Sequence, residues 1–505
     1  MTRLPLRRLW KTRRLPILIL AGALLVLIIV LWVSAGARLR RPAVDPLADY
    51  RPALGPRFVL DPVRIDQLLT YSITVQINPT ALVYTGTVEV TFPVSSTTPM
   101  NELYFRLYPN LRQFNGRLEV TSASVNDVAV SYAYTSQDSA IHIVPPKPLR
   151  AGSRAWARIG FAGSPPDRPA GSYSLVGRSD GILSLMGFYP MLAAHRGQEW
   201  ATDVADPQGD SGFEDAALFK VDVTAPADQV IAATGTQVGR RPAANGWVTT
   251  RYVQGPAREF TLLLSPHFQT MQEEAYGTLV RSYFLPEDVD AGKSALYDGL
   301  AAMQIYSDAF GPYPYREMDV VEAPLTFRGQ EFPGMSLIGI QDYRQTASEL
   351  ERLVSHEVAH QWWYNQVGSD QTMQPWQDEG LAEFSMYFYF TARHGQASAD
   401  TLRQLRWAAP VSLARQRGID APIGRPVTYY DKGNYETIVY GKGALFFATL
   451  RDEIGADAFR DLLRTYLANY RWRVAPPEAL RTMAGKLAGR DLGLLFSRWL
   501  DGAVE

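Results

Sequence analysis

Length, composition and charge limit the classes of protein that this chain can form. It has 505 residues, 46% of them hydrophobic and 20% charged, so it can fold several globular domains and is too apolar to be wholly disordered. The lack of cysteine excludes disulfide scaffolds, iron–sulfur clusters and thiol nucleophiles, and it restricts candidate metal ligands to histidine and carboxylate side chains. Residues 1–41 carry nine Lys and Arg and no acid, which leaves a charge of −10 on the rest. Because nucleic acids bind basic faces, we expect no nucleic-acid partner.

The N-terminal segment has the sequence of a membrane anchor. Residues 1–14 form a basic tail, and residues 15–35 contain an uncharged apolar run from Pro16 to Val33. As a helix rising ~1.5 Å per residue, this run nearly spans a ~30 Å hydrocarbon layer, which predicts an uncleaved transmembrane helix. A cleaved signal peptide is the alternative. The basic tail predicts a cytoplasmic N-terminus. We therefore expect a single-pass plasma-membrane protein, with the lipid bilayer as a partner and the body outside the cytoplasm.

Three segments follow the predicted anchor. Residues 36–62 are rich in proline and poor in large apolar side chains, which predicts an extended, semi-rigid linker. Apolar and polar residues then alternate as in half-buried strands, with turn signals between them, so we predict one antiparallel β-domain over 63–268. The apolar spacing next becomes helical, which predicts a second, mainly helical domain over 269–505.

Several helices are predicted in this second domain. One has its buried face at Leu296, Leu300, Met303 and Phe310. Thr346 and Glu349 have the spacing of a capping box, which predicts a helix over 347–364. Four more helices are predicted near the C-terminus, at 446–454, 458–470, 477–487 and 492–500.

The capped helix carries the residues of a candidate metal site. His356, Glu357 and His360 form the pattern H-E-x-x-H, and the four-residue spacing places both imidazoles on one helix face. A second helix around Glu379, eighteen residues further on, would supply a third ligand. Two His and one Glu leave a fourth position for water, as in catalytic rather than structural zinc sites, so we predict one Zn²⁺ per chain. A chance match is the alternative.

Two further carboxylates are candidates for supporting roles. Glu357 points away from the two imidazoles by one residue's rotation of ~100°, which makes it the candidate general base that takes a proton from water and passes it to the leaving amine. Glu383 lies one turn after Glu379, so it is a candidate to accept the outer N–H of a ligand histidine. A solvated helix charge is the alternative for Glu383.

These motifs resemble the membrane alanyl aminopeptidase family of gluzincin zinc metallopeptidases. The similarity rests on His356-Glu357-x-x-His360-Gln361-Trp362-Trp363, Trp376-x-x-Glu379-Gly380, Phe310–Tyr315 and Tyr440–Ala444. The resemblance implies a multidomain fold class: after the N-terminal transmembrane helix come an antiparallel β-saddle domain and a mainly helical, thermolysin-like α+β catalytic domain. Many family members add a large C-terminal helical domain, so this chain resembles a short form without it.

The resemblance also implies substrate contacts and an activity. The segment from Gly329 to Pro333 looks like the family's exopeptidase loop, in which Glu331 would bind the substrate's α-amine, although Gln330 stands where the family has Met. Tyr440 would donate its hydroxyl to the oxyanion of the intermediate. We therefore predict zinc-dependent removal of N-terminal residues from peptide substrates. The alternatives are an endopeptidase, an epoxide-hydrolase-like use of the same site, and a non-catalytic surface binding protein.

Overall fold

The computed structural model describes residues 45–58, 65, 67–95, 97–169, 175–325 and 327–502. The chain divides into two compact units, Met1–Asp49 and Tyr50–Glu505. The predicted basic tail and transmembrane helix lie outside the described residues. The second unit has a β-rich N-terminal region (residues 67–268) and a largely helical C-terminal region (residues 269–502), as predicted.

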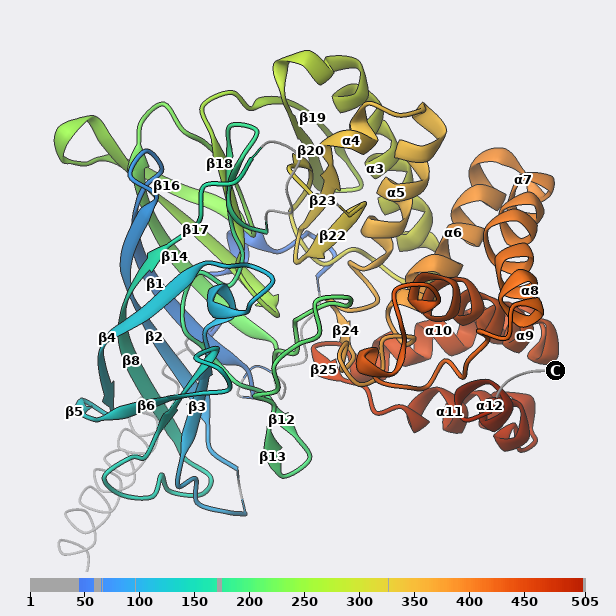
Figure 1. The fold of residues 1–505 in the computed structure, drawn as a ribbon, viewed down its shortest axis with the longest axis horizontal. Coiled ribbons are helices and arrows are strands. Elements are labelled where there is room, and N and C mark those ends of the chain that lie inside the picture. The colour runs from blue at the N-terminus through green and yellow to red at the C-terminus, as the bar shows by residue number, and fades with distance from the viewer. Residues whose placement is uncertain are drawn as a thin grey trace, which may run out of the picture. The chain divides into compact units, whose positions relative to one another are not determined.

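The β-rich region is built on an eight-stranded sheet whose order is β16-β17-β14-β1-β2-β8-β4-β5 (Figure 1). In β1, buried residues alternate with exposed ones, which is the pattern that predicted half-buried strands. The strands of this sheet are β1 (Leu69–Asn78), β2 (Val83–Pro93), β4 (Arg117–Val125), β5 (Val128–Ala129), β8 (Arg154–Ser164), β14 (Ala217–Pro226), β16 (Thr236–Pro242) and β17 (Trp247–Ala257).

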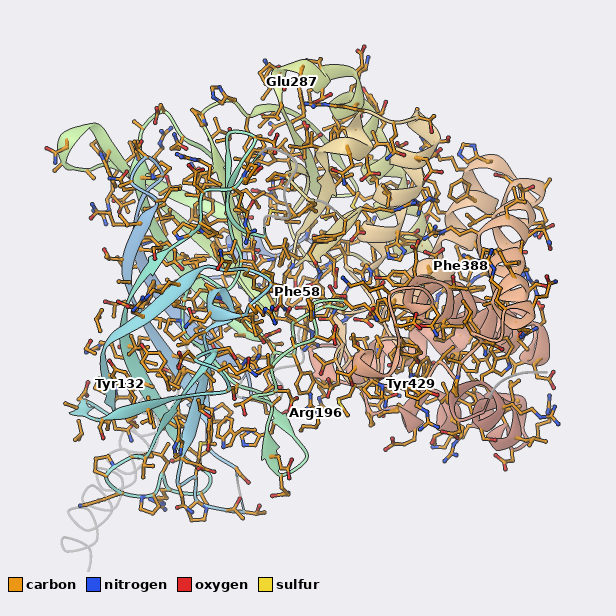
Figure 2. All side chains as sticks on the ribbon, viewed as in Figure 1. Phe58, Tyr132, Arg196, Glu287, Phe388 and Tyr429 are labelled. Atoms are coloured by element: carbon orange, nitrogen blue, oxygen red, sulfur yellow. The ribbon has the colours of Figure 1, made fainter. Side chains whose placement is uncertain are left out.

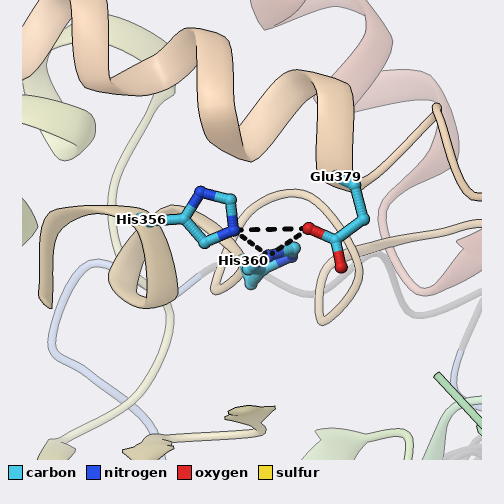
Figure 3. Close-up of side chains that lie close together, drawn as sticks. All are labelled: His356, His360 and Glu379. Atoms are coloured by element: carbon cyan, nitrogen blue, oxygen red, sulfur yellow. Dashed lines mark hydrogen bonds and ion pairs between the residues drawn. The ribbon is translucent and has the colours of Figure 1, made fainter. Parts of the chain in front are cut away.

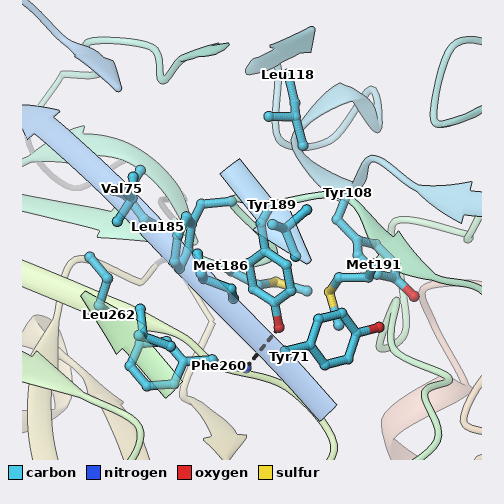
Figure 4. Close-up of a cluster of buried hydrophobic side chains, with 14 of the residues drawn as sticks. Tyr71, Val75, Tyr108, Leu118, Leu185, Met186, Tyr189, Met191, Phe260 and Leu262 are labelled. Atoms are coloured by element: carbon cyan, nitrogen blue, oxygen red, sulfur yellow. Dashed lines mark hydrogen bonds between the residues drawn. The ribbon is translucent and has the colours of Figure 1, made fainter. Parts of the chain in front are cut away.

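Two four-stranded sheets and a short hairpin complete the β-rich region. One sheet has the order β15-β18-β10-β9 and the other β11-β3-β7-β6, while β12 pairs with β13. These strands are β3 (Leu103–Arg106), β6 (Tyr132–Thr135), β7 (Ala140–Ile143), β9 (Val176–Ser179), β10 (Ile182–Leu185), β11 (Met191–Leu192), β12 (His195–Arg196), β13 (Glu199–Trp200), β15 (Val230–Ala233) and β18 (Leu262–Ser265). In the core between the sheets, the Phe260 N–H donates to the Tyr189 hydroxyl at 3.2 Å (Figure 4).

The expectation of a purely antiparallel β-domain is corrected at one pair of strands. β1 and β14 run parallel, with Leu69 opposite Ala217. A parallel pair needs a long connection, and here some 140 residues of chain separate the two strands. Local alternation of apolar residues reports which face of a strand is buried but not the direction of its neighbour, so the sequence could not reveal this pair.

The C-terminal region begins with a five-stranded sheet of order β19-β20-β21-β23-β22, which leaves β22 at the edge beside α5 (Figure 1). Its strands are β19 (Gln269–Ala275), β20 (Thr278–Phe284), β21 (Glu317–Ala323), β22 (Gly329–Phe332) and β23 (Met335–Gly339). The helices are α3 (Val289–Phe310), α4 (Ile340–Tyr343), α5 (Ala347–Ala359), α6 (Glu379–His394), α7 (Gln396–Leu402), α8 (Ala409–Gln416), α9 (Gly443–Ile454), α10 (Ala456–Tyr470), α11 (Glu478–Ala488) and α12 (Gly493–Leu500). A short pair joins β24 (Val367–Gly368) to β25 (Arg473–Val474), and two π-helices span Arg403–Ala408 and Glu436–Lys442.

The predicted helices are present with small shifts at their ends. The four C-terminal ones correspond to α9–α12 within three residues, and α5 begins after Thr346, whose hydroxyl accepts the Glu349 N–H at 3.3 Å as the capping motif predicted. α5 ends at Ala359 rather than at residue 364. Tyr364, further along the turn that follows, takes a φ of 119°, and Trp362 and Trp363 are buried in this turn.

Residues 51–58 belong to the predicted extended linker, but the structure shows them packed against the rest of the second unit. Arg51–Ala53 form a 3₁₀ helix with Ala53 buried, and the Gly55 N–H donates to the Pro314 carbonyl at 2.8 Å. The ring of Phe58, labelled in Figure 2, lies 6.2 Å from that of Trp472. Residues 51–58 therefore pack on the rest of the second unit. The boundaries 36–62, 63–268 and 269–505 stay our proposal.

The predicted localisation is corrected. Within the described part of the chain, no helix combines the length and the apolar sequence needed to cross a bilayer. α3 is long enough at 22 residues, but Asp290, Lys293 and Asp298 are among its charged residues, and it packs on α5 and β20. The placement as a single-pass plasma-membrane protein with an extracytoplasmic body is therefore withdrawn.

Candidate active site

Three side chains from two helices converge on one point. His356 and His360 lie on one face of α5, and Glu379 is the first residue of α6, after the N-cap Asp378 (Figure 3). The His356 Nε2 atom lies 3.3 Å from Glu379 Oε2 and 3.2 Å from His360 Nε2, and His360 Nε2 lies 3.4 Å from Glu379 Oε2. All three side chains are buried. The predicted ligand set is therefore assembled around a common centre.

The spacing of these atoms fits a tetrahedral zinc ion. Ligand atoms bound at ~2.0–2.1 Å in tetrahedral geometry are ~3.3 Å apart, which is the separation observed for each of the three pairs. Nitrogen and carboxylate oxygen are also ligands that zinc accepts in the absence of cysteine. The residues present thus fit Zn²⁺.

The two imidazoles are oriented by their outer nitrogens. His360 Nδ1 donates to the carbonyl of Trp363 at 3.0 Å, and His356 Nδ1 lies 3.2 Å from Glu383 Oε2, an ion-pair distance whose angle is outside that of a good hydrogen bond. A proton on each Nδ1 leaves the Nε2 lone pair free for a metal. The buried Glu383 is not the solvated charge that was its alternative interpretation.

Glu383 is itself held by two partners from the first π-helix. Its carboxylate accepts Arg406 Nε at 2.5 Å and the indole N–H of Trp407 at 2.7 Å. Burial opposes ionisation of Glu383, but the charge of Arg406 and the contact with His356 hold the pKa of that carboxyl below its usual range. Glu383 therefore remains an anion behind His356.

Glu379 is likewise kept ionised. Burial alone would raise its pKa, but the hydrogen bonds and charges of His356 and His360 hold the pKa of Glu379 below its usual range. Its second oxygen, Oε1, accepts the hydroxyl of Tyr440 at 2.6 Å. Tyr440 lies on the second π-helix, and its ring stacks on that of His356 with centroids 5.7 Å apart. Burial raises the pKa of Tyr440, so the hydroxyl stays a proton donor.

Glu357 lines one cavity together with His356, His360 and Glu379, beside β22. Burial raises its pKa to about 7, against the opposing effect of the two histidines, which places the group close to neutral pH. A Cβ atom at Gly329 would lie 2.2 Å from Glu357 Oε1. The strand therefore needs glycine at this position, because any side chain there would occupy the space of the Glu357 carboxylate.

Glu331 lies two residues further along β22 and is buried with 3% of its surface exposed. Its carboxylate accepts Gln371 Nε2 at 2.8 Å and Gln330 Nε2 at 2.9 Å. Gln330 also donates to Asp210 at 2.8 Å, so the amide joins two carboxylates. Burial, and then the nearby Asp210, raise the pKa of Glu331. This part of the cavity is acidic and would suit a cationic ligand group.

Seven of the eight predicted site residues line one cavity of about 680 Å³, and Glu383 lies behind it. Sequence reasoning missed the partners that hold these residues. Arg406 and Trp407 lie 23 and 24 residues after Glu383, and Gln371 lies 40 residues after Glu331. No periodicity or motif connects side chains at such separations. The Trp363 carbonyl is local to His360, but its role depends on the unpredicted turn after α5.

Comparison with known families agrees with this geometry. Residues 297–499 match the family model described as the Peptidase family M1 domain. This segment is similar to the Peptidase family M1 domain, and we call it the M1 domain. The matched segment contains the zinc-fitting residues, and the fold around the M1 domain is similar to that of solved structures.

Two structures from Deinococcus radiodurans illustrate this fold. An M1 zinc metallopeptidase mutant aligns with a TM-score of 0.66 and 21% identity, covering 90% of this chain and 96% of that one. The same enzyme bound to a Tyr-Ser-Ala substrate aligns with a TM-score of 0.64 and 20% identity, covering 90% and 96%. At these identities the likeness concerns the fold, which here includes the β-rich region as well as the M1 domain.

Curated relatives include plant and animal aminopeptidases. Aminopeptidase M1-B of Oryza sativa subsp. japonica is 28% identical over 243 residues, which are 44% of this chain and 27% of the relative. Endoplasmic reticulum aminopeptidase 1 of Rattus norvegicus is 20% identical over 498 residues, which are 89% of this chain and 51% of the relative. The chain thus spans about half, or less, of the length of these relatives.

Proposed function

We propose that the protein is a zinc-dependent aminopeptidase that releases N-terminal residues from peptides. The observation that carries this proposal is the convergence of His356, His360 and Glu379 at zinc-ligand spacing in a cavity that also holds a buried acid, Glu331. The similarity of the chain to curated aminopeptidases supports it.

In this proposal His356, His360 and Glu379 hold the metal, and Glu383 orients His356. When bound, zinc supplies a Lewis acid that polarises the scissile carbonyl and eases the ionisation of water. Glu357 accepts the proton of the attacking water on its carboxylate and passes it to the leaving amine, for which a pKa near neutrality is suited.

Other residues bind the substrate's α-ammonium group and the oxygen of its scissile carbonyl. Glu331 pairs with the α-ammonium group, whose pKa is ~8, and Gln330 and Gln371 hold the carboxylate in position for this. Tyr440 donates its hydroxyl to the oxyanion that forms on the scissile carbonyl. Gly329 leaves the room that Glu357 needs beside the substrate strand.

The exopeptidase claim is tested with matched blocked and free substrates. The zinc-loaded protein should release alanine from Ala-Ala-Ala but not from its N-acetylated form, because acetylation removes the charge that Glu331 pairs with. Glu357→Ala should abolish release while zinc content, measured by elemental analysis, stays at one per chain. Equal cleavage of both peptides would instead indicate an endopeptidase, and a function that survives Glu357→Ala would indicate a binding protein.

A further inference from the structure

The amide that holds Glu331 lies in an irregular segment of the M1 domain. Gln371 is 2% exposed and donates from Nε2 to Glu331 Oε1 at 2.8 Å. It belongs to the stretch between β24, which ends at Gly368, and α6, which begins at Glu379, so its backbone lies outside the hydrogen-bond ladders of helices and sheets. The position of the Gln371 amide therefore depends on the contacts of the residues on either side of it.

One guanidinium holds both of these neighbouring residues. Arg196, labelled in Figure 2, lies in the β12–β13 hairpin of the β-rich region. It donates from Nε to Asp370 Oδ2 at 2.5 Å and from Nη2 to Asp370 Oδ1 at 3.1 Å. Its Nη2 also donates to Thr372 Oγ1 at 3.1 Å, and the Thr372 hydroxyl donates to Asp370 Oδ1 at 2.8 Å. Arg196 thus joins the residues before and after Gln371.

These contacts are of a strong kind. A guanidinium that binds a carboxylate through two nitrogens fixes its orientation as well as its distance. The Asp370 side chain is 12% exposed and that of Arg196 is 29% exposed, so water competes weakly for the pair. The guanidinium also lies 5.4 Å from the centre of the buried Phe213 ring. The second acid on Arg196, Asp203, is 59% exposed, which leaves Asp370 as the better shielded partner.

The hairpin that carries Arg196 is anchored in the β-rich region. Arg196 is paired with Glu199, and His195 with Trp200, across the two short strands. The Trp200 ring lies 3.8 Å from the His195 ring and 5.9 Å from the ring of Tyr104 in β3. The Arg196 side chain therefore connects a fixed part of the β-rich region to the segment of the M1 domain that carries Gln371.

We propose that Arg196 is a positioning residue for amine binding by Glu331. It fixes the chain on both sides of Gln371, and Gln371 orients the carboxylate that pairs with the substrate's α-ammonium group. The β-rich region thereby contributes to the selection of a free N-terminus without touching the substrate. Gln330 holds the other oxygen of Glu331, Oε2, at 2.9 Å, so loss of the Arg196 contacts loosens the carboxylate rather than releasing it. The inference rests on the proposed aminopeptidase function.

The test uses two zinc-binding inhibitors, alanine hydroxamate and propanohydroxamate, which differ only in the α-amine. The ratio of their inhibition constants, measured on the zinc-loaded full chain with Ala-Ala-Ala as substrate, reports the amine contact because the metal-binding group is the same. We expect the parent protein to bind alanine hydroxamate more tightly. Arg196→Gln should reduce this preference about tenfold, since charge-assisted hydrogen bonds weaken steeply when their geometry changes. Asp370→Asn, on the other side of the contact, should reduce it to a similar extent.

Arg178→Gln is the matched control. Arg178 lies in β9, whose residues do not line the active-site cavity, and it binds Asp167 through two nitrogens at 3.0 and 2.7 Å with 35% of its side chain exposed. This variant should retain the preference of the parent protein. The route is tested by adding Arg196→Gln to Gln371→Ala. Because Arg196 acts through Gln371, the second change should not alter the ratio further, and independent losses that multiply would overturn the route.

The outcomes separate this inference from the proposed function. Equal inhibition of the parent protein by the two hydroxamates would show that the cavity has no amine site, and both proposals would fail. A preference that is retained in Arg196→Gln and in Asp370→Asn would overturn the positioning role alone. Weaker inhibition by both hydroxamates to the same extent would mean that Arg196 serves only the fold, and it would also overturn the inference.

Discussion

Gly329 has no side chain, and this leaves the space that the Glu357 carboxylate occupies. Adding a Cβ atom there brings it 2.2 Å from Glu357 Oε1, so the carboxylate must move. Because a displacement of about 1 Å at a reacting group can lower a rate by ~10²-fold, we expect Gly329→Ala to lower kcat by that order. The three metal ligands are not touched, so zinc content and affinity should remain those of the parent protein.

The matched control is Gly239→Ala in β16, where the new Cβ meets its nearest neighbour at 3.8 Å, an ordinary contact. The two variants and the parent should be compared by kcat on Ala-Ala-Ala, by zinc content and by thermal melting. A kcat for Gly329→Ala within a factor of two of that for Gly239→Ala would contradict the assignment of Glu357 as general base next to β22.

Glu383 acts on zinc through His356 rather than by direct contact. Glu383→Gln keeps the shape of the side chain but removes the charge that faces His356 Nδ1 at 3.2 Å. Carboxylates in this position typically raise metal affinity by ~10–100-fold, so we expect zinc affinity to fall by a similar factor, measured by competition with a chromophoric chelator. Glu436→Gln is the control, because that side chain is 64% exposed and lies 3.6 Å from Arg406. Unchanged zinc affinity in Glu383→Gln would contradict the role of Glu383 in orienting His356.

At the scale of single elements, the sequence predicts what is local and periodic. The Thr346 cap and the HExxH face of α5 follow from spacings of a few residues, and a second helix around Glu379 was predicted without its start. The end of α5 was placed five residues too late, because the residues after His360 have no helix-breaking proline or glycine, and tertiary packing of the two tryptophans decides the turn. The π-helices that carry Arg406 and Tyr440 have no sequence signature either.

Strand β21 contains a buried acid that should make stability depend on pH. Burial raises the pKa of Asp319 to about 8, partly offset by Arg281 and increased by Glu317, whereas an unfolded aspartate titrates near ~3.9. The folded state therefore binds more protons than the unfolded state between these values. Its contribution to stability is present below about pH 4 and is lost as the pH rises to 8.

Asp319→Asn replaces the protonated acid with a neutral group of the same shape. We expect this variant to resemble the parent protein at pH 5 and to be more stable than it at pH 9, by more than ~1 kcal/mol, in urea unfolding followed by circular dichroism. Asp127→Asn, in an exposed turn, should change stability by the same small amount at both values of pH. If Asp319→Asn shows no gain at pH 9, the acid is not buried in the way that the structure shows.

At the scale of the whole described unit, side chains that no local pattern indicates join the β-rich region to the M1 domain. Arg258 directly follows β17, and its guanidinium donates to three carbonyls: Tyr364 at 2.5 Å, Glu214 at 2.8 Å and Arg473 at 3.0 Å. A buried arginine surrounded by backbone oxygens from both regions is a contact that exists only after the chain has folded. The sequence indicates that Arg258 is charged but not where its charge is used.

Arg258→Met tests how far this side chain holds the two regions together. The change keeps an unbranched apolar stem but leaves three buried carbonyls without their donor, and hydrogen bonds to a charged group each contribute ~1.5–3 kcal/mol. We expect the free energy of unfolding to fall by about 3 kcal/mol or more, with the β-rich region and the M1 domain melting in separate steps by calorimetry. Arg251→Met, in β17, removes only an exposed ion pair with Asp222 and should cost about 1 kcal/mol or less. Equal effects of the two substitutions would mean that the regions are joined by the apolar contacts of the interface and not by the Arg258 guanidinium.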